Sequence, residues 1–119
     1  MIIDVAHGII SYGYITEVYS RNGAYYGFIV SCDPPYRTFF FHENERGVLV
    51  RGDYEMPVII PLGNRFSGPT ISHLKNPEVG DPVAYYPGVS DRGPIARMWS
   101  IFLSRKPSFS APYLAEIKN

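Results

Sequence analysis

The sequence predicts a small all-β protein built as a single antiparallel barrel. The chain has 119 residues, 45% of them hydrophobic, which suffices for one core but would leave two cramped. It contains 11 glycines and 11 prolines, together a larger share than the ~12% of average proteins, so turns are frequent. Short stretches rich in β-branched and aromatic residues alternate with these turns, as expected for short strands.

Five such stretches supply the strands of the predicted barrel. In chain order they are 13–19, 25–30, 38–42, 82–86 and 96–103. The turn residues between them, such as Asn-Gly, Asp-Pro-Pro and Pro-Gly, lie at 21–23, 33–35 and 87–91. We therefore expect an antiparallel barrel in which the first three strands are neighbours.

A longer segment, 46–75, is inserted between the third and fourth of these strands. Residues 48–50 and 58–60 are apolar and mostly β-branched, and they flank the polar sequence RGDYEMP. We expect the segment to form an added hairpin or a long loop beside the barrel, and in the hairpin 51–57 would be the turn. The chain is thus predicted to be one domain, 1–119, with a core at 13–45 and 76–103 and a C-terminal extension at 104–119.

Aromatic side chains mark one face of the second and third strands. Side chains alternate between the two faces of a strand, and this alternation sorts the rings into two sets. The set predicted to be buried is Ile29, Phe39 and Phe41, joined in the core by Trp99. The set left on the opposite face is Tyr26, Phe28, Phe40 and His42. An exposed patch of rings indicates a binding surface, unless the insertion or another subunit covers it.

Five segments resemble the motifs of the cold-shock domain family, in the family's order. YYGFIV at 25–30 resembles the first ribonucleoprotein motif, KGFGFI, and TFFFHE at 38–43 resembles the second, DVFVHF. GYI at 13–15 is similar to the opening GTV, EVGDPVAY at 78–85 to EGDxVxF, and RGPIA at 92–96 to G-P-x-A. The resemblance implies a five-stranded OB-type barrel that binds single-stranded RNA or DNA by base stacking.

Carried over to this chain, the stacking aromatics of the family fall on the four rings that alternation places together, Tyr26, Phe28, Phe40 and His42. Two other family rings are replaced by carboxylates, at Glu17 and Glu43. Simple alternation puts Glu17 on the same face as the apolar Ile15, so we expect a bulge or an early strand end near Glu17.

The charge balance limits how such a protein would hold a nucleic acid. Basic and acidic residues both number 11, which argues against a binder that relies on a general positive field. Eight of the basic residues are arginines, which favour stacking and forked hydrogen bonds. The best candidates for phosphate contacts are Arg21, Arg37 and Arg92.

Residues with catalytic or metal-binding chemistry are few and scattered. His7, His42 and His73 have no spacing typical of a metal site, and one cysteine, Cys32, excludes an internal disulfide. The charge of the neighbouring Asp33 would raise the pKa of the Cys32 thiol, which disfavours a nucleophile. We therefore expect no enzyme, no metal and no cofactor.

No segment approaches the ~20 apolar residues that span a bilayer, and the first residues lack a signal-peptide pattern. We therefore expect a cytoplasmic protein without a membrane partner.

These observations lead to two hypotheses of different classes. The first is a protein that binds single-stranded RNA or DNA with low sequence specificity through its aromatic rings, as an RNA chaperone or expression regulator. The alternative is a protein-interaction or assembly module that has kept the barrel and lost nucleic-acid binding. Glu17, Glu43, the zero net charge and the long insertion favour the alternative. The sequence leaves a homodimer open.

Overall fold

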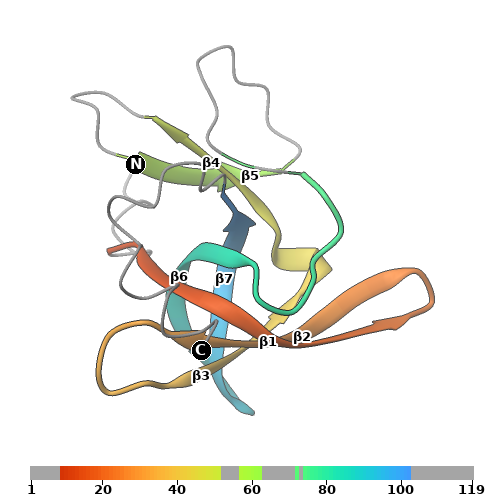
Figure 1. Ribbon diagram of the computed structural model, residues 1–119, viewed down its shortest axis with the longest axis horizontal. Helices are drawn as coiled ribbons and strands as arrows, with labels where there is room; N and C mark the ends of the chain where they lie inside the picture. The colour runs from red at the N-terminus through yellow and green to blue at the C-terminus, as the bar shows by residue number, and fades with distance from the viewer. Residues whose placement is uncertain (1–8, 52–56, 63–71, 73, 103–119) are drawn as a thin grey trace.

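A computed structural model describes residues 9–51, 57–62, 72 and 74–102 of the chain (Figure 1). Five strands form the barrel and two form a separate hairpin. The barrel strands are β1 (Ser11–Arg21), β2 (Ala24–Ser31), β3 (Thr38–His42), β6 (Pro82–Ser90) and β7 (Gly93–Ile101). A short 3-10 helix, η1 (Glu43–Glu45), follows β3, and the hairpin consists of β4 (Gly47–Arg51) and β5 (Pro57–Pro61). All seven predicted strands are present.

The barrel closes in the order β1-β2-β3-β7-β6. Four of its five neighbouring pairs are antiparallel, but β3 and β7 are parallel, with Phe40 opposite Ile95. The expectation of a fully antiparallel barrel was therefore wrong at this pair. A closed ring with an odd number of strands cannot alternate direction throughout, so one parallel pair is unavoidable.

The predicted bulge lies in β1, at Thr16. The pairing of β1 with β2 shifts between Ile15, which faces Ile29, and Glu17, which faces Phe28. Ile15 is fully buried whereas Glu17 is exposed, so the extra residue changes the face that later β1 side chains occupy. The backbones approach closely here, because a Cβ on Gly27 would collide with the carbonyl oxygen of Glu17.

The β1–β2 turn is the tight connection that its Asn-Gly sequence predicts. Asn22 and Gly23 have φ angles of 55° and 84°, as a type I′ turn requires. This turn brings Arg21 and Ala24 opposite each other at the end of the hairpin.

The barrel interior is filled by aromatic and β-branched side chains. The core residues are Ile15, Ile29, Phe39, Phe41, Val83, Tyr85, Ala96, Trp99 and Ile101. The predicted burial of Ile29, Phe39, Phe41 and Trp99 is confirmed. Trp99 packs edge-on against Phe41, with ring centroids 4.7 Å apart, and its indole N–H donates to the carbonyl oxygen of His42 at 2.7 Å.

The inserted hairpin packs on the barrel as an extra layer. Leu49 of β4 and Ile59 of β5 form a second apolar cluster with Ala84, Tyr86 and Phe102. The backbone N–H of Ile59 also donates to the Tyr86 hydroxyl at 3.3 Å. Figure 1 shows the hairpin above β6 and β7, with β3 on the opposite side of the barrel and the β1–β2 turn projecting to the right.

Some predicted boundaries were wrong. Residues 87–90 are paired in β6 instead of forming a turn, because they face the first residues of β7, from Gly93 to Ala96. The strand β7 accordingly begins at Gly93 and not at residue 96. Pairing with a partner strand outweighs the local turn preference of Pro87 and Gly88. Arg51 and Pro57, predicted as the ends of the hairpin turn, instead pair with each other in β4 and β5. The rest of that predicted turn, 52–56, the extension at 104–119, His7 and His73 lie outside the described residues.

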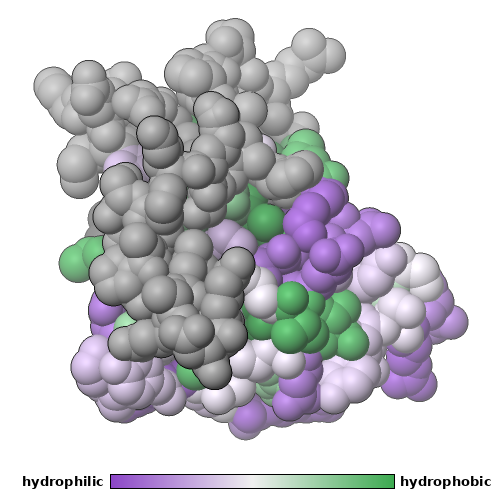
Figure 2. All heavy atoms as spheres, viewed as in Figure 1, coloured by the Kyte–Doolittle hydropathy of each residue, from purple (hydrophilic) through white to green (hydrophobic). Residues whose placement is uncertain are grey.

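On the face shown in Figure 2, the described hydrophobic residues form small patches separated by polar ones. No helix among the described residues is long and apolar enough to cross a membrane.

Candidate functional site

The antiparallel pairing of β1, β2 and β3 builds two rows of side chains across one outer face of the barrel. In the first row, Tyr26 lies opposite Tyr19 on one side and His42 on the other. In the second row, Phe28 lies opposite Glu17 and Phe40. We call the five ring-bearing residues of these rows the aromatic face: Tyr19, Tyr26, Phe28, Phe40 and His42.

The rings of the aromatic face contact one another within and between the rows. Tyr26 contacts three of the other rings. The centroid of its ring lies 5.4 Å from that of Tyr19, 6.2 Å from that of Phe40 and 6.4 Å from that of His42. The planes of Tyr26 and His42 differ by only 16°. Phe28 meets Phe40 edge-on at 5.9 Å. The four rings predicted to share a face therefore do so, and they form one continuous surface.

Tyr19 is the member that the sequence prediction missed. Its side chain is 46% exposed, and the Thr16 bulge places it on the same face as Tyr26. Once a bulge between Ile15 and Glu17 is assumed, counting by twos from Glu17 reaches Tyr19. The signal was therefore present in the alternation of the first strand.

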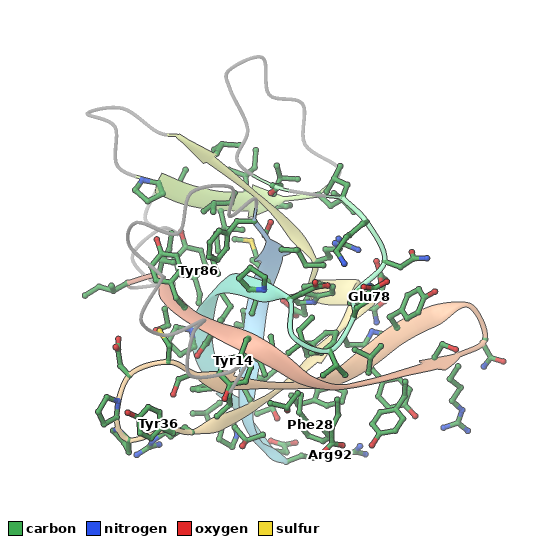
Figure 3. All side chains as sticks on the ribbon, in the orientation of Figure 1. Tyr14, Phe28, Tyr36, Glu78, Tyr86 and Arg92 are labelled. Carbon is green, nitrogen blue, oxygen red and sulfur yellow. The ribbon has the colours of Figure 1, made fainter. Side chains whose placement is uncertain are left out.

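A groove of about 470 Å³ runs along one side of the aromatic face. Its lining comes from the β1–β2 turn, the faces of β2 and β3, and the β6–β7 turn. The lining residues are Arg21, Asn22, Ala24, Tyr26, Phe40, His42 and Arg92. Figure 3 shows Phe28 and Arg92 near each other on the lower side of the barrel, while Tyr86 lies on the upper side toward the hairpin.

The three arginines predicted to meet phosphates do not lie together. Arg21 and Arg92 approach the groove from two different turns. Arg37 precedes β3 at the other end of that strand, where its backbone N–H donates to the Ser31 hydroxyl at 2.9 Å. Arg37 and His42 are five positions apart, about 17 Å of extended chain. The groove thus brings together two of the three cations.

Glu17 borders the aromatic face, as the sequence comparison implied. Its carboxylate accepts a hydrogen bond from the Tyr19 hydroxyl at 2.5 Å. This hydrogen bond and the negative charge of Glu17 raise the pKa of Tyr19 above its usual value of 10. The edge of the second row is therefore a carboxylate that is hydrogen-bonded to Tyr19.

Glu43 does not border the aromatic face in the same way. It begins η1, and its carboxylate lies 3.5 Å from the guanidinium of Arg46. Arg46 is buried, with its guanidinium 4.8 Å from the centre of the Trp99 ring. The charge of Glu43 is thus paired with a cation at the end of the barrel, and Glu43 is absent from the groove lining.

His42 joins the aromatic face to η1. Its Nδ1 accepts a hydrogen bond from the backbone N–H of Asn44 at 3.0 Å. In the neutral ring the proton is then on Nε2, which leaves an N–H donor on a side chain that lines the groove.

Other groups with reactive chemistry stand apart from one another. The described residues contain no cluster of three or more histidine, cysteine, aspartate or glutamate side chains that could hold a metal. Cys32 is half-buried at the end of β2, and burial raises its thiol pKa, with a further rise from Asp33. A raised pKa disfavours the reactive thiolate form of Cys32.

No protein-family profile, curated protein or solved structure matches this chain.

Proposed function

We propose that this protein binds single-stranded RNA or DNA by stacking bases on the aromatic face. The observation that carries the proposal is the pair of cross-strand rows, in which five rings form one outer surface beside a groove. Unstacked bases gain ~1–3 kcal/mol each from stacking on an aromatic side chain. Because every base has a π face, such a surface has low sequence specificity by itself.

The positions of the charged and polar groups agree with this proposal. Arg21 and Arg92 line the groove from opposite turns, so a strand whose bases stack on Tyr26 and Phe40 would pass between two cations. A guanidinium can form forked hydrogen bonds with a phosphate. The Nε2–H of His42 supplies a further donor in the same groove.

The barrel architecture gives additional support. OB-type barrels bind oligonucleotides with the face of their second and third strands and with the loops that join strands one to two and four to five. In this barrel the second and third strands are β2 and β3, and the fourth and fifth are β6 and β7. The corresponding loops are the β1–β2 turn and the β6–β7 turn, and all four elements contribute to the lining of the groove. The resemblance to the cold-shock domain supports the same function, with a role as a non-enzymatic RNA chaperone or expression regulator in the cytoplasm.

The alternative proposal is a protein-interaction or assembly module that uses the aromatic face. The exposed Glu17 carboxylate and the zero net charge favour it, because both weaken attraction to phosphates. The described strands of the inserted hairpin do not favour it, since they pack with Tyr86 and Phe102 on the other side of the barrel.

Titration of fluorescein-labelled oligouridine and oligothymidine, followed by anisotropy, tests the proposal. We expect saturable binding by the natural protein and its loss in the double variant Phe28→Ala with Phe40→Ala. Tyr36→Ala is the matched control, because Tyr36 is 65% exposed in the β2–β3 loop and lies outside the groove. Thermal unfolding of each variant establishes that it is folded.

Two results would contradict nucleic-acid binding. One is the absence of any anisotropy change with folded natural protein at low salt. The other is equal affinity of the natural protein and the double alanine variant. Sedimentation velocity of the same samples addresses the alternative, since a self-association that depends on Phe28 and Phe40 would favour the assembly module.

A further inference from the structure

The second row of the site ends in a carboxylate where a third ring would complete the stack. Glu17, Phe28 and Phe40 are direct cross-strand neighbours, so the Cβ atoms of adjacent members are about 4.5–5.5 Å apart. A base stacked on Phe28 therefore has the Glu17 carboxylate beside its edge. The carboxylate is close enough to accept hydrogen bonds from donors on that edge.

A hydrogen bond within β1 orients the carboxylate before any ligand arrives. The Tyr19 hydroxyl donates to Oε1 of Glu17, and the Tyr19 ring is in turn packed on Tyr26 at 5.4 Å. Within the described part of the chain, Glu17 forms no ion pair, so no cation competes for its oxygens. An ionised carboxylate has about four acceptor positions, and one hydrogen bond from Tyr19 leaves the others for a ligand.

An acceptor-only group distinguishes bases by their donors. Guanine carries two adjacent donors on its Watson–Crick edge, N1–H and the N2 amino group, which match the two oxygens of a carboxylate. Uracil and thymine carry one N–H between two carbonyl oxygens, and those oxygens repel a carboxylate. Cytosine and adenine offer a single amino group next to a ring-nitrogen acceptor.

We infer that Glu17 makes the aromatic face selective for guanine in a single strand, an inference that rests on the proposed nucleic-acid binding. Stacking on Phe28 and Phe40 supplies affinity for any base, and Glu17 adds preference for the base with paired donors. Tyr19 acts as a positioning residue that orients the carboxylate. The site is therefore selective at one base position and tolerant at the others.

The test compares heptamers that differ at one central position. The probes are fluorescein-labelled TTTGTTT and TTTTTTT, each as DNA and as the uridine-containing RNA. A single guanine avoids the self-association of guanine runs. We expect the natural protein to bind the guanine probe about tenfold more tightly, within the range expected for a bidentate contact to a base edge. Inosine, which keeps N1–H but lacks the amino group, should bind with intermediate affinity.

Two variants that each remove one negative charge separate a direct contact between Glu17 and the base from the effect of net charge on binding. Glu17→Gln keeps the shape of the side chain but adds amide donors, so the guanine preference should disappear while binding of the thymine probe is kept or increased. Asp33→Asn is the control, because Asp33 is exposed in the β2–β3 loop and belongs neither to the groove lining nor to the cross-strand row that contains Glu17. It should leave the tenfold preference intact.

The outcomes separate this inference from the function on which it rests. Equal binding of both probes by the natural protein, or an unchanged guanine preference in Glu17→Gln, would overturn the role of Glu17 and leave the proposed function standing. No binding of any probe by the folded protein would overturn both. Loss of the preference in Asp33→Asn as well would show that net charge, and not Glu17, sets it.

Discussion

Arg46 is a buried cation that closes one end of the barrel. Its guanidinium lies over the Trp99 ring and within 3.5 Å of the Glu43 carboxylate, and it donates to the carbonyl oxygen of Lys75 at 2.7 Å. The residue therefore links η1, β7 and the segment before β6. A cation on a desolvated aromatic ring contributes about 2 kcal/mol, more than a surface ion pair.

We predict that Arg46→Met lowers the free energy of unfolding by about 2 kcal/mol, because the charged contact with Trp99 and the hydrogen bond to Lys75 are lost. The free energy of unfolding is measured by urea titration, with the fluorescence of Trp99 as the signal. The matched control is Arg97→Met, since Arg97 is 41% exposed and its Glu45 partner is 3.6 Å away. That change should cost less than about 1 kcal/mol. Equal losses in the two variants would contradict a structural role for Arg46.

Tyr85 makes stability sensitive to alkaline pH. Its side chain is fully buried in the barrel, and burial, followed by the influence of Cys32 and Asp33, raises its pKa above that of an exposed tyrosine. Above pH 10 the unfolded chain loses this proton while the folded chain keeps it. The stability that the protonated phenol contributes is therefore complete below pH 10 and is lost as the pH rises further.

We predict that Tyr85→Phe removes this part of the pH dependence. The unfolding free energy of the variant minus that of the natural protein should be about 1.4 kcal/mol larger at pH 11 than at pH 7. This is the effect expected when the pH lies one unit above the pKa of Tyr85 in the unfolded chain, while Tyr85 in the folded chain stays protonated. Urea unfolding at pH 7, 9, 10 and 11 measures the difference. If the unfolding free energies of the two proteins changed in parallel from pH 7 to 11, Tyr85 would have the same pKa in the folded and unfolded chains, which would contradict the prediction.

At the scale of elements, the inserted hairpin is attached to the barrel by a small apolar cluster. Ile59 is 3% exposed and contacts the side of the barrel that carries Tyr86, away from the aromatic face. Truncation of a buried isoleucine to alanine costs about 2–5 kcal/mol. The hairpin should therefore matter for stability more than for binding.

We predict that Ile59→Ala lowers the free energy of unfolding by about 3 kcal/mol and leaves oligonucleotide affinity unchanged at temperatures where the variant is folded. Unfolding in urea and anisotropy titration of the same sample give the two quantities. Tighter oligonucleotide binding by this variant would mean that the insertion covers the aromatic face, as the protein-interaction hypothesis requires.

The whole molecule has no net charge, so the phosphates of a ligand must be met by individual cations. Two of the predicted three, Arg21 and Arg92, line the groove. For a single strand, each neutralised phosphate contributes about −0.7 to the slope of log affinity against log salt concentration.

We predict a slope of about −1.4 for the natural protein and about −0.7 for Arg92→Ala, measured by anisotropy from low to moderate salt. A slope near −2.1 that falls in Arg37→Ala would place the ligand along the whole of β3 instead of the groove alone. A slope several times steeper would mean that another surface binds the nucleic acid.

The strands, and the faces of β2 and β3, could be predicted from local patterns in the sequence. Alternation in 25–30 and 38–42 separated Phe39 and Phe41 from Phe28 and Phe40, because the pleat of a strand is a local property of the backbone. The Asn-Gly turn and the inserted hairpin were likewise visible, since turn geometry and β-branched stretches are local signals.

The contacts between residues from distant segments became known only from the folded arrangement of the strands. The position of the bulge put Tyr19 on the aromatic face, because a shift of one residue reverses the face of every later side chain. Closure of the ring brought Arg92 to the groove beside Arg21 and left Arg37 outside it. Arg46 became a core residue because Trp99, 53 positions later, supplies the ring beneath it. Such contacts depend on how strands pair and pack across the whole chain, which local periodicity does not specify.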